Sequence, residues 1–243
     1  MKNLYDMIFK RKSVRRYDES LHLSAEQLAA IEARLKELAP LDADIRLGFK
    51  IAARPETSCK IGEYCVLVYS EQKAGCLENV GYALEQLDLW LASQDIGACW
   101  YGWGKTPERE LDGLKFVIML AIGKCRSEDF RADYTKAKRK PLAEIWSGES
   151  FLDIAAARYA PSACNSQPWR VKSFPDRLEV FRSRDIQARL AKTLGKFYNK
   201  IDIGIFLCFL ETALAHEGLA FERELIPEDE GAEPIPVAVY RIK

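Results

Sequence analysis

Two long apolar segments constrain the fold of this 243-residue chain more than any other feature. The first, 79–95, has helical spacing, and its apolar positions spread beyond one face: Tyr82, Ala83, Leu84, Leu87, Leu89, Trp90 and Leu91. The second, 202–217, is apolar in the same way. A helix that is apolar nearly all round is buried, so both segments are expected inside one core. The composition permits this, because 48% of the residues are hydrophobic.

The two segments also align with each other. Laying Gly81 over Gly204 pairs Leu84 with Leu207, Leu87 with Leu210, Asp88 with Glu211 and Leu91 with Leu214. This match favours a degenerate internal duplication. The alternative is chance similarity between two leucine-rich helices.

Strand-like runs surround both segments. Before residue 140 they are 45–52, 64–69 and 115–123; after it they are 169–174, 178–181, 220–225 and 236–242. Pro175-Asp176-Arg177 is a hairpin signal between two of them. Shorter helices are predicted at 4–9, after the capping box Ser24-Ala25-Glu26-Gln27, from Thr106-Pro107, and at 142–146, 151–159 and 185–198. The mixture predicts an α+β fold, packed as one compact unit from the halves 1–140 and 141–243.

A polar loop joins the helix expected at 151–159 to the strand that begins at Trp169. Its sequence is Ala160-Pro161-Ser162-Ala163-Cys164-Asn165-Ser166-Gln167-Pro168-Trp169. Prolines stiffen it, and its hydroxyls and amides can both donate and accept hydrogen bonds, which suits a flat heterocycle with polar edges. An ordinary helix-to-strand turn is the alternative, since these residue types also form turns.

A basic segment lies near the other end of the chain, Arg11-Lys12-Ser13-Val14-Arg15-Arg16-Tyr17. In an extended segment Arg11, Ser13 and Arg15 would point to one side. Arginine forks and a serine hydroxyl suit phosphate oxygens, so an anion clamp is one interpretation. A solvated charged face is the other.

Together the two stretches resemble the signatures of the FMN-dependent nitroreductase family. The Pro-Ser-x-x-Asn-x-Gln-Pro-Trp loop is the more specific of the two. The resemblance implies mixed, mainly antiparallel sheets flanked by helices. In that family the two signatures come from different subunits of a homodimer, whereas here each occurs once, in opposite halves. The chain therefore resembles the fused-dimer subgroup called putative TM nitroreductases, which implies a monomer with an internal pseudo-dimer.

The resemblance also implies roles for single residues. Arg11, Ser13 and Arg139 would hold the FMN phosphate, and Arg15 would reach the pyrimidine edge of the ring. The ring would be lined by Pro161, Ser162, Ala163 and Asn165, with the backbone N–H of Gly102 near flavin N5. The candidate cofactor-binding set is completed by Lys12, Tyr101, Trp103 and Gln167.

The implied function is an NAD(P)H-driven, FMN-dependent oxidoreductase. A nitroaromatic, quinone or similar small molecule would accept two electrons, and the flavin would carry the chemistry without a catalytic side chain. A non-catalytic flavin-binding protein and a scaffold that has lost FMN are the alternatives. No metal is expected, because His22 and His216 stand outside any motif.

Charge and cysteine usage exclude other classes of function. Lys plus Arg equals Asp plus Glu, 36 of each, so no global field attracts nucleic acid or a membrane surface. Gly104-Lys105-Thr106 is not a P-loop, because Cys99 stands where the first glycine is required. The seven cysteines form no Cys-x-x-Cys pair, and no secretory or membrane-spanning segment is evident. A cytoplasmic protein with reduced thiols is expected.

Overall fold

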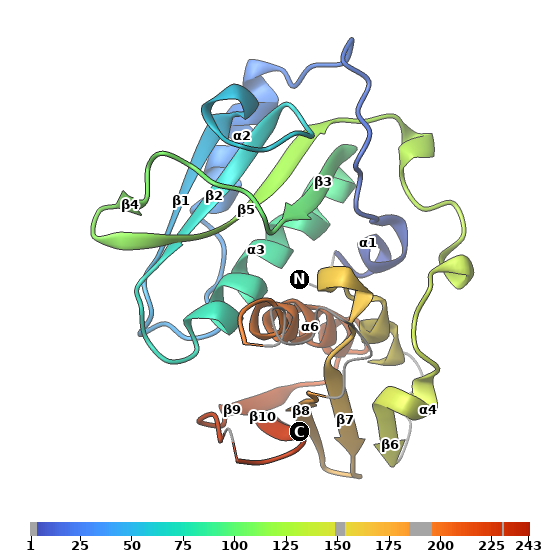
Figure 1. Ribbon diagram of the computed structural model, residues 1–243. Coiled ribbons are helices and arrows are strands. Elements are labelled where there is room, and N and C mark those ends of the chain that lie inside the picture. Colours follow the sequence, from blue (N-terminus) through green and yellow to red (C-terminus); the bar gives the residue numbers. More distant parts are fainter. Residues whose placement is uncertain (1–3, 149–153, 185–195, 230) are drawn as a thin grey trace.

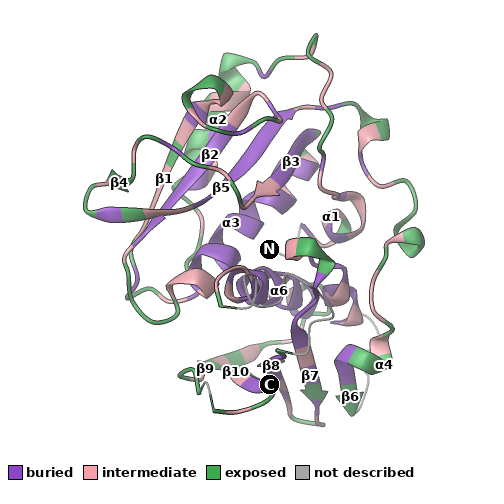
Figure 2. Cartoon of the chain, in the orientation of Figure 1, coloured by how far each residue is buried: buried purple, intermediate pink, exposed green. Residues whose placement is uncertain are grey.

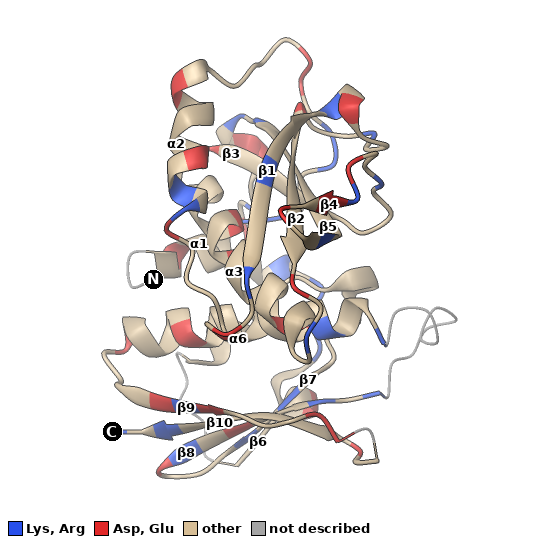
Figure 3. Ribbon diagram, turned by 90° about the vertical axis from the view of Figure 1, so that its left-hand side faces the viewer, with Lys and Arg blue, Asp and Glu red and all other residues tan. Residues whose placement is uncertain are grey.

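The computed structural model describes residues 4–148, 154–184, 196–229 and 231–243. Two β-sheets form its outer layers, and the helices α3 (Cys76–Ser93) and α6 (Tyr198–His216) lie between them (Figure 1). Both helices are buried along almost their whole length (Figure 2). This confirms the prediction that the two apolar segments share one core. Basic and acidic residues are interspersed along the outer elements (Figure 3).

The first sheet contains β1 (Leu47–Ala53), β2 (Tyr64–Ser70), β5 (Leu114–Lys124) and β3 (Ile96–Tyr101), in that order. The short β4 (Glu110–Leu111) pairs with the start of β5. All of these pairs are antiparallel. The order leaves β3 at an edge of the sheet, where the segment that follows α1 (Tyr5–Lys10) runs beside it.

The second sheet contains β6 (Trp146–Gly148), β7 (Trp169–Ser173), β8 (Arg177–Arg182), β10 (Ile235–Ile242) and β9 (Phe221–Leu225). Only β6 pairs in parallel, with β7. Without β6 the order β7-β8-β10-β9 repeats the order β1-β2-β5-β3. In each sheet the long buried helix follows the second strand in the chain. The predicted α+β class and the mainly antiparallel pairing are therefore confirmed.

The helices α3 and α6 meet at the two glycines that the sequence alignment pairs. A Cβ on Gly81 would lie 2.1 Å from the carbonyl oxygen of Ile201, and one on Gly204 would lie 1.9 Å from that of Glu78. Each glycine thus faces the carbonyl three residues before the other glycine. The two backbones are in direct contact, and no side chain fits between them.

Several shorter elements differ from the sequence prediction. The capping box at Ser24 is confirmed at the start of α2 (Ala25–Leu35). No helix begins at Thr106, because Tyr69 Oη donates to the carbonyl of Glu108 and the amide of Phe116 donates to the carbonyl of Arg109, which draws this stretch toward the sheet. The strand β3 is not among the strand-like runs predicted from the sequence.

The remaining short helices are only partly described. Residues Leu142–Ile145 form α4, and Ile154–Tyr159 form a 3₁₀-helix, where an α-helix over 151–159 was expected. Residues 151–153, and residues 185–195 of the helix predicted at 185–198, lie outside the described residues.

The helix crossing predicts a large effect for one added methyl group. Gly204→Ala should lower the free energy of unfolding by about 3 kcal/mol, because backbone must move to admit the Cβ. Gly113→Ala is the control, since its Cβ would meet nothing within 4 Å and only its φ of +79° opposes a side chain; it should cost about 1 kcal/mol. Urea unfolding measures both. Equal losses would contradict the close crossing.

Candidate functional site

A cavity of about 370 Å³ lies where the two halves of the chain meet. The first half contributes the segment after α1, the end of β3 and the turn that follows it. The second half contributes the polar loop and the first turns of α6. The lining residues are Ser13, Arg15, Ile61, Cys99, Trp100, Tyr101, Gly102, Trp103, Ile118, Pro161, Ser162, Ala163, Cys164, Tyr198, Ile201, Asp202 and Ile205. The two sequence signatures thus meet at one cavity.

The segment after α1 is fixed to the edge of the first sheet. Ser13 forms a parallel bridge with Ala98 of β3, and the amide of Val14 donates to the Ala98 carbonyl at 3.0 Å. The extended backbone alternates its side chains, so Ser13 and Arg15 line the cavity while Val14 is buried in the core. The alternation expected from the sequence therefore holds for Ser13 and Arg15.

Arg11 points elsewhere. Its side chain is only 2% exposed, and its Nε lies 3.2 Å from Asp88 Oδ2 and 3.9 Å from Glu85 Oε1, both on α3. The expectation that Arg11 points to the same side as Ser13 and Arg15 therefore does not hold, because its side chain lies in the core. Sequence pattern missed this because the two carboxylates lie about 75 residues away in the chain and meet Arg11 only across α1 and α3.

The cluster around Arg11 holds two acids against one base. Burial opposes the charge of Arg11, but the carboxylates of Asp88 and Glu85 outweigh it and raise the Arg11 pKa. Burial, and next the neighbouring Asp88, raise the pKa of Glu85 well above its ordinary value. Glu85 Oε2 also accepts from Trp100 Nε1 at 2.8 Å. Burial also raises the pKa of Asp88, although the charge of Arg11 opposes this rise.

The polar loop 160–167 has a strained backbone. Cys164, Asn165 and Gln167 all have positive φ, at 50°, 56° and 49°. Such conformations cost free energy in residues other than glycine and persist where surrounding contacts enforce them. Here Ser162 Oγ accepts from the Gln167 amide at 3.0 Å, and Asp202 Oδ1 accepts from the Ala163 amide at 2.9 Å.

Asn165 and Gln167 face away from the cavity and hold a neighbouring segment. Asn165 Nδ2 donates to the carbonyl of Lys138 at 2.9 Å, and its Oδ1 accepts from Arg139 Nη1 at 3.1 Å. Gln167 Oε1 accepts from the Lys140 amide at 2.8 Å. The expectation that Asn165 lines a ring is not met, because these bonds turn its amide toward Arg139.

Arg139 belongs to a group of partly buried arginines. Burial, and next the charges of Arg11 and Arg131, lower the pKa of Arg139 to about 10. Burial and the charge of Arg11 lower the pKa of Arg131 to about 10. Arg139 Nε is buried and has no hydrogen-bond partner among the described residues. Cations that oppose one another in this way form a site for an anion.

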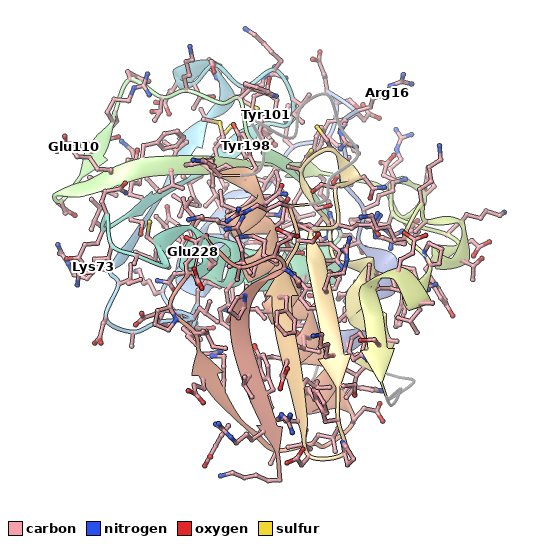
Figure 4. All side chains as sticks on the ribbon, turned by 60° about the horizontal axis from the view of Figure 1, so that its bottom comes forward. Arg16, Lys73, Tyr101, Glu110, Tyr198 and Glu228 are labelled. Atoms are coloured by element: carbon pink, nitrogen blue, oxygen red, sulfur yellow. The ribbon has the colours of Figure 1, made fainter. Side chains whose placement is uncertain are left out.

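Aromatic rings form the mouth of the cavity. Tyr198 Oη donates to the carbonyl of Gly102 at 2.7 Å, and a Cβ on Gly102 would lie 2.7 Å from the Tyr198 ring. Trp103 is 70% exposed, and its ring centroid lies 6.1 Å from that of Tyr198. Figure 4 shows Tyr101 and Tyr198 close to each other on this side of the molecule. Glycine is required at 102 because a side chain there would clash with the Tyr198 ring.

Comparisons with known proteins fit this arrangement. The family model described as Putative TM nitroreductase matches residues 3–214. The chain belongs to this family. A putative nitroreductase of Thermotoga maritima has a similar fold, with a TM-score of 0.65 at 18% identity, over 98% of this chain and 92% of that one. Membership supports an oxidoreductase activity.

Two further solved structures are less similar to this family member. A nitroreductase family protein of Clostridium difficile aligns with a TM-score of 0.46 at 15% identity, over 60% of this chain and 98% of that one. A putative NADH dehydrogenase/NAD(P)H nitroreductase of Parabacteroides distasonis gives 0.46 at 16%, over 62% and 100%. A search of curated sequences gives no significant match.

The structure divides the thirteen candidate residues of this nitroreductase family member into two groups. Eight line the cavity: Ser13, Arg15, Tyr101, Gly102, Trp103, Pro161, Ser162 and Ala163. Five do not: Arg11, Lys12, Arg139, Asn165 and Gln167. The polar lining residues that sequence reasoning missed include Tyr198 and Asp202. The signal for Asp202 was available, since it is an acid in the predicted buried segment 202–217, which is mainly apolar.

Two functional classes receive no support from the described residues. No group of three or more His, Cys, Asp or Glu side chains there could hold a metal ion. No helix in this part of the chain has the length and apolar character required to cross a membrane.

The burial of Arg11 predicts an effect on stability. Arg11→Met should lower the free energy of unfolding by about 3–5 kcal/mol at pH 8, because it leaves carboxylates buried without a counter-charge. The loss should be smaller at pH 5. Glu85 and Asp88 have a higher pKa in the folded state than in the unfolded state. Such carboxyls stabilise the folded state at a pH below their pKa in the unfolded state, and this stabilisation is lost as the pH rises.

The neighbouring Lys10→Met is the matched control. Its Nζ forms a solvent-exposed pair with Asp95, 2.6 Å away, and such pairs contribute about 0–1 kcal/mol. Urea unfolding at the two pH values measures both variants. A loss in Arg11→Met no larger than in Lys10→Met would contradict the buried cluster.

Proposed function

We propose that this protein is an FMN-dependent oxidoreductase that uses NAD(P)H to reduce a small-molecule acceptor by two electrons. One observation carries the proposal: Ser13 and Arg15 of the Arg-x-Ser-x-Arg segment line the same cavity of about 370 Å³ as Pro161, Ser162 and Ala163 of the Pro-Ser-x-x-Asn loop, 146 or more residues away in sequence. A nitroaromatic or quinone is the proposed acceptor class.

The cavity walls fit a flat ring with polar edges. Ile118, Ile201 and Ile205 are apolar, while Ser13, Arg15 and Ser162 present hydrogen-bonding groups. Arg15 would place its positive charge at the polar edge of the ring, and the backbone of Gly102 would approach the ring closely. When bound, the flavin supplies the hydride-transfer chemistry, and the chain binds it, orients it and limits access of water.

The phosphate is assigned to the arginine group. Arg139 and Arg131 carry charges that burial and mutual repulsion disfavour, so a phosphate dianion would relieve both. Arg11 adds its positive charge to that of Arg131 and Arg139 from the core, and its Nη2 lies 3.5 Å from Ser13 Oγ. We therefore propose Arg139 as the main phosphate ligand and Arg11 as a residue that positions Ser13.

The two halves are proposed to be a pseudo-dimer within one polypeptide, with the boundary near residue 140. The repeated strand order and the reciprocal contacts of Gly81 and Gly204 support this. A second cavity of about 400 Å³ is lined by Glu78 and Lys73 on the first half and by Arg182, Lys200 and Glu228 on the second. Since α3 and α6 already bury the surfaces that subunits would share, we propose a monomer in solution.

The second cavity differs chemically from the first. Glu228 pairs with both Arg182 and Lys200 within it, so its cations already have a carboxylate partner. Figure 4 places Glu228 and Lys73 well away from Tyr101 and Tyr198. We therefore propose one flavin per chain, in the first cavity.

Reconstitution with FMN tests the function. The expected result is one FMN per chain by absorbance after release, and bleaching of the bound flavin when NADH or NADPH is added without oxygen. Bound flavin that neither donor bleaches would favour the alternative, a flavin-binding protein without catalysis. Two flavins per chain would contradict the pseudo-dimer with one site.

Arg139 gives a test of the phosphate assignment. Arg139→Ala should weaken FMN binding about 10- to 100-fold, because it removes a charge-assisted hydrogen bond. Riboflavin lacks the phosphate and should bind the variant and the wild type about equally. Fluorescence-quenching titrations with both flavins measure this, and Lys136→Ala, an exposed cation three residues away, is the control. Equal weakening of riboflavin would place Arg139 at the ring or in the fold.

A further inference from the structure

Asp202 is a buried acid in the cavity wall. It lies on the second turn of α6 and is 3% exposed. Its Oδ1 accepts from the Ala163 amide at 2.9 Å, and its Oδ2 lies 3.3 Å from Ser166 Oγ. Among the described residues that line this cavity it is the only carboxylic acid, and no Lys, Arg or His nitrogen there lies within 4.0 Å of it.

The surroundings of Asp202 favour its neutral form. Burial raises its pKa to about 8, and the two hydrogen bonds reduce that rise. The other charged or titratable side chains that line the cavity are Arg15 beside β3, Cys99 and Tyr101 on β3, Cys164 in the loop and Tyr198 on α6. Glu78 and Lys200 line the second cavity instead. Arg158 lies over the Tyr159 ring.

The other half of the chain shows what a purely structural side chain does at this place. The alignment of Gly81 with Gly204 puts Asn79 opposite Asp202. Asn79 Oδ1 accepts from the amide of Leu41 at 2.7 Å, as Asp202 Oδ1 accepts from that of Ala163. Both side chains thus hold a loop that follows an Ala-Pro pair. An amide is sufficient to hold the loop. The acid at position 202 differs from an amide because it carries a proton that it can transfer.

Reduction of a quinone or nitro group requires a proton as well as a hydride. From these observations we infer that Asp202 donates this proton to the acceptor, an inference that rests on the proposed function. A bound, reduced flavin would supply the hydride and its electron pair. An O–H bond forms on the acceptor oxygen, the O–H bond of Asp202 breaks, and its electron pair stays on the carboxylate. Water then returns a proton to Asp202.

Asp202→Asn tests the inference, since it reproduces the side chain that the chain itself uses at position 79. Stopped-flow absorbance would follow the FMN-loaded protein, first reduced by NAD(P)H and then mixed with an acceptor. Reoxidation by a quinone should slow about 100-fold or more, the usual contribution of a general acid. Reoxidation by ferricyanide, which takes electrons without a proton, should stay within about twofold because no acid takes part in it.

The pH dependence separates proton donation from a structural role. In the wild type the quinone rate should be constant below about pH 8 and fall above it, as Asp202 loses its proton. The variant should lack this fall. Asp95→Asn, which changes an exposed acid paired with Lys10, should behave as the wild type. Equal slowing with quinone and ferricyanide would mean that Asp202 only holds the loop, and would overturn the inference.

A second measurement needs neither cofactor nor turnover. Infrared difference spectra of the flavin-free protein, taken from about pH 6 to about pH 10, should show a protonated carboxyl that disappears near pH 8 and is missing in Asp202→Asn. A carboxyl already ionised at pH 6 would overturn the inference. Failure of the proposed function gives a different result. In that case the wild type itself would show no bleaching by NAD(P)H, and the inference about proton donation would fail as well.

Discussion

The direct backbone contact between α3 and α6 is the constraint on which the rest of the structure depends. Gly81 and Gly204 let the two helices approach until each Cα faces a carbonyl of the other helix. This brings the two sheets to opposite sides of one helical layer, with the loop 160–167 against the first turns of α6. Because the two halves meet at this crossing, residues from both of them line the cavity. Close packing of this kind leaves little freedom for the two halves to shift.

Burial of charge gives the site its chemical character. In the Arg11 cluster two buried acids share one base, and burial raises the pKa of both acids. Arg131 and Arg139 instead repel each other and Arg11, so the positive field persists beside the cavity. Asp202 is the opposite case, an acid buried without a cation. One small region therefore contains groups that favour a bound anion and a group that favours a bound proton.

The strained loop is held by contacts from both halves of the chain. Its positive φ angles at Cys164, Asn165 and Gln167 would relax in an isolated peptide. Side chains of the loop bind the backbone at Lys138 and Lys140, and Asp202 binds the backbone of the loop. The polar residues of this signature thus serve mainly to fix the backbone, while Pro161, Ser162 and Ala163 line the cavity.

From the sequence we could predict the two buried helices, the α+β class, the strands except β3, β4 and β6, and a shared ligand site that includes Ser13, Arg15 and Pro161–Ala163. Each depends on local periodicity or on a short motif, which a chain carries without its fold. Three features depend on the tertiary structure. Arg11 pairs with Asp88, Asn165 bonds to Arg139, and Asp202 lines the cavity. A side chain with several possible partners takes the one that packing brings within reach, and that distance is set by residues far away in the sequence.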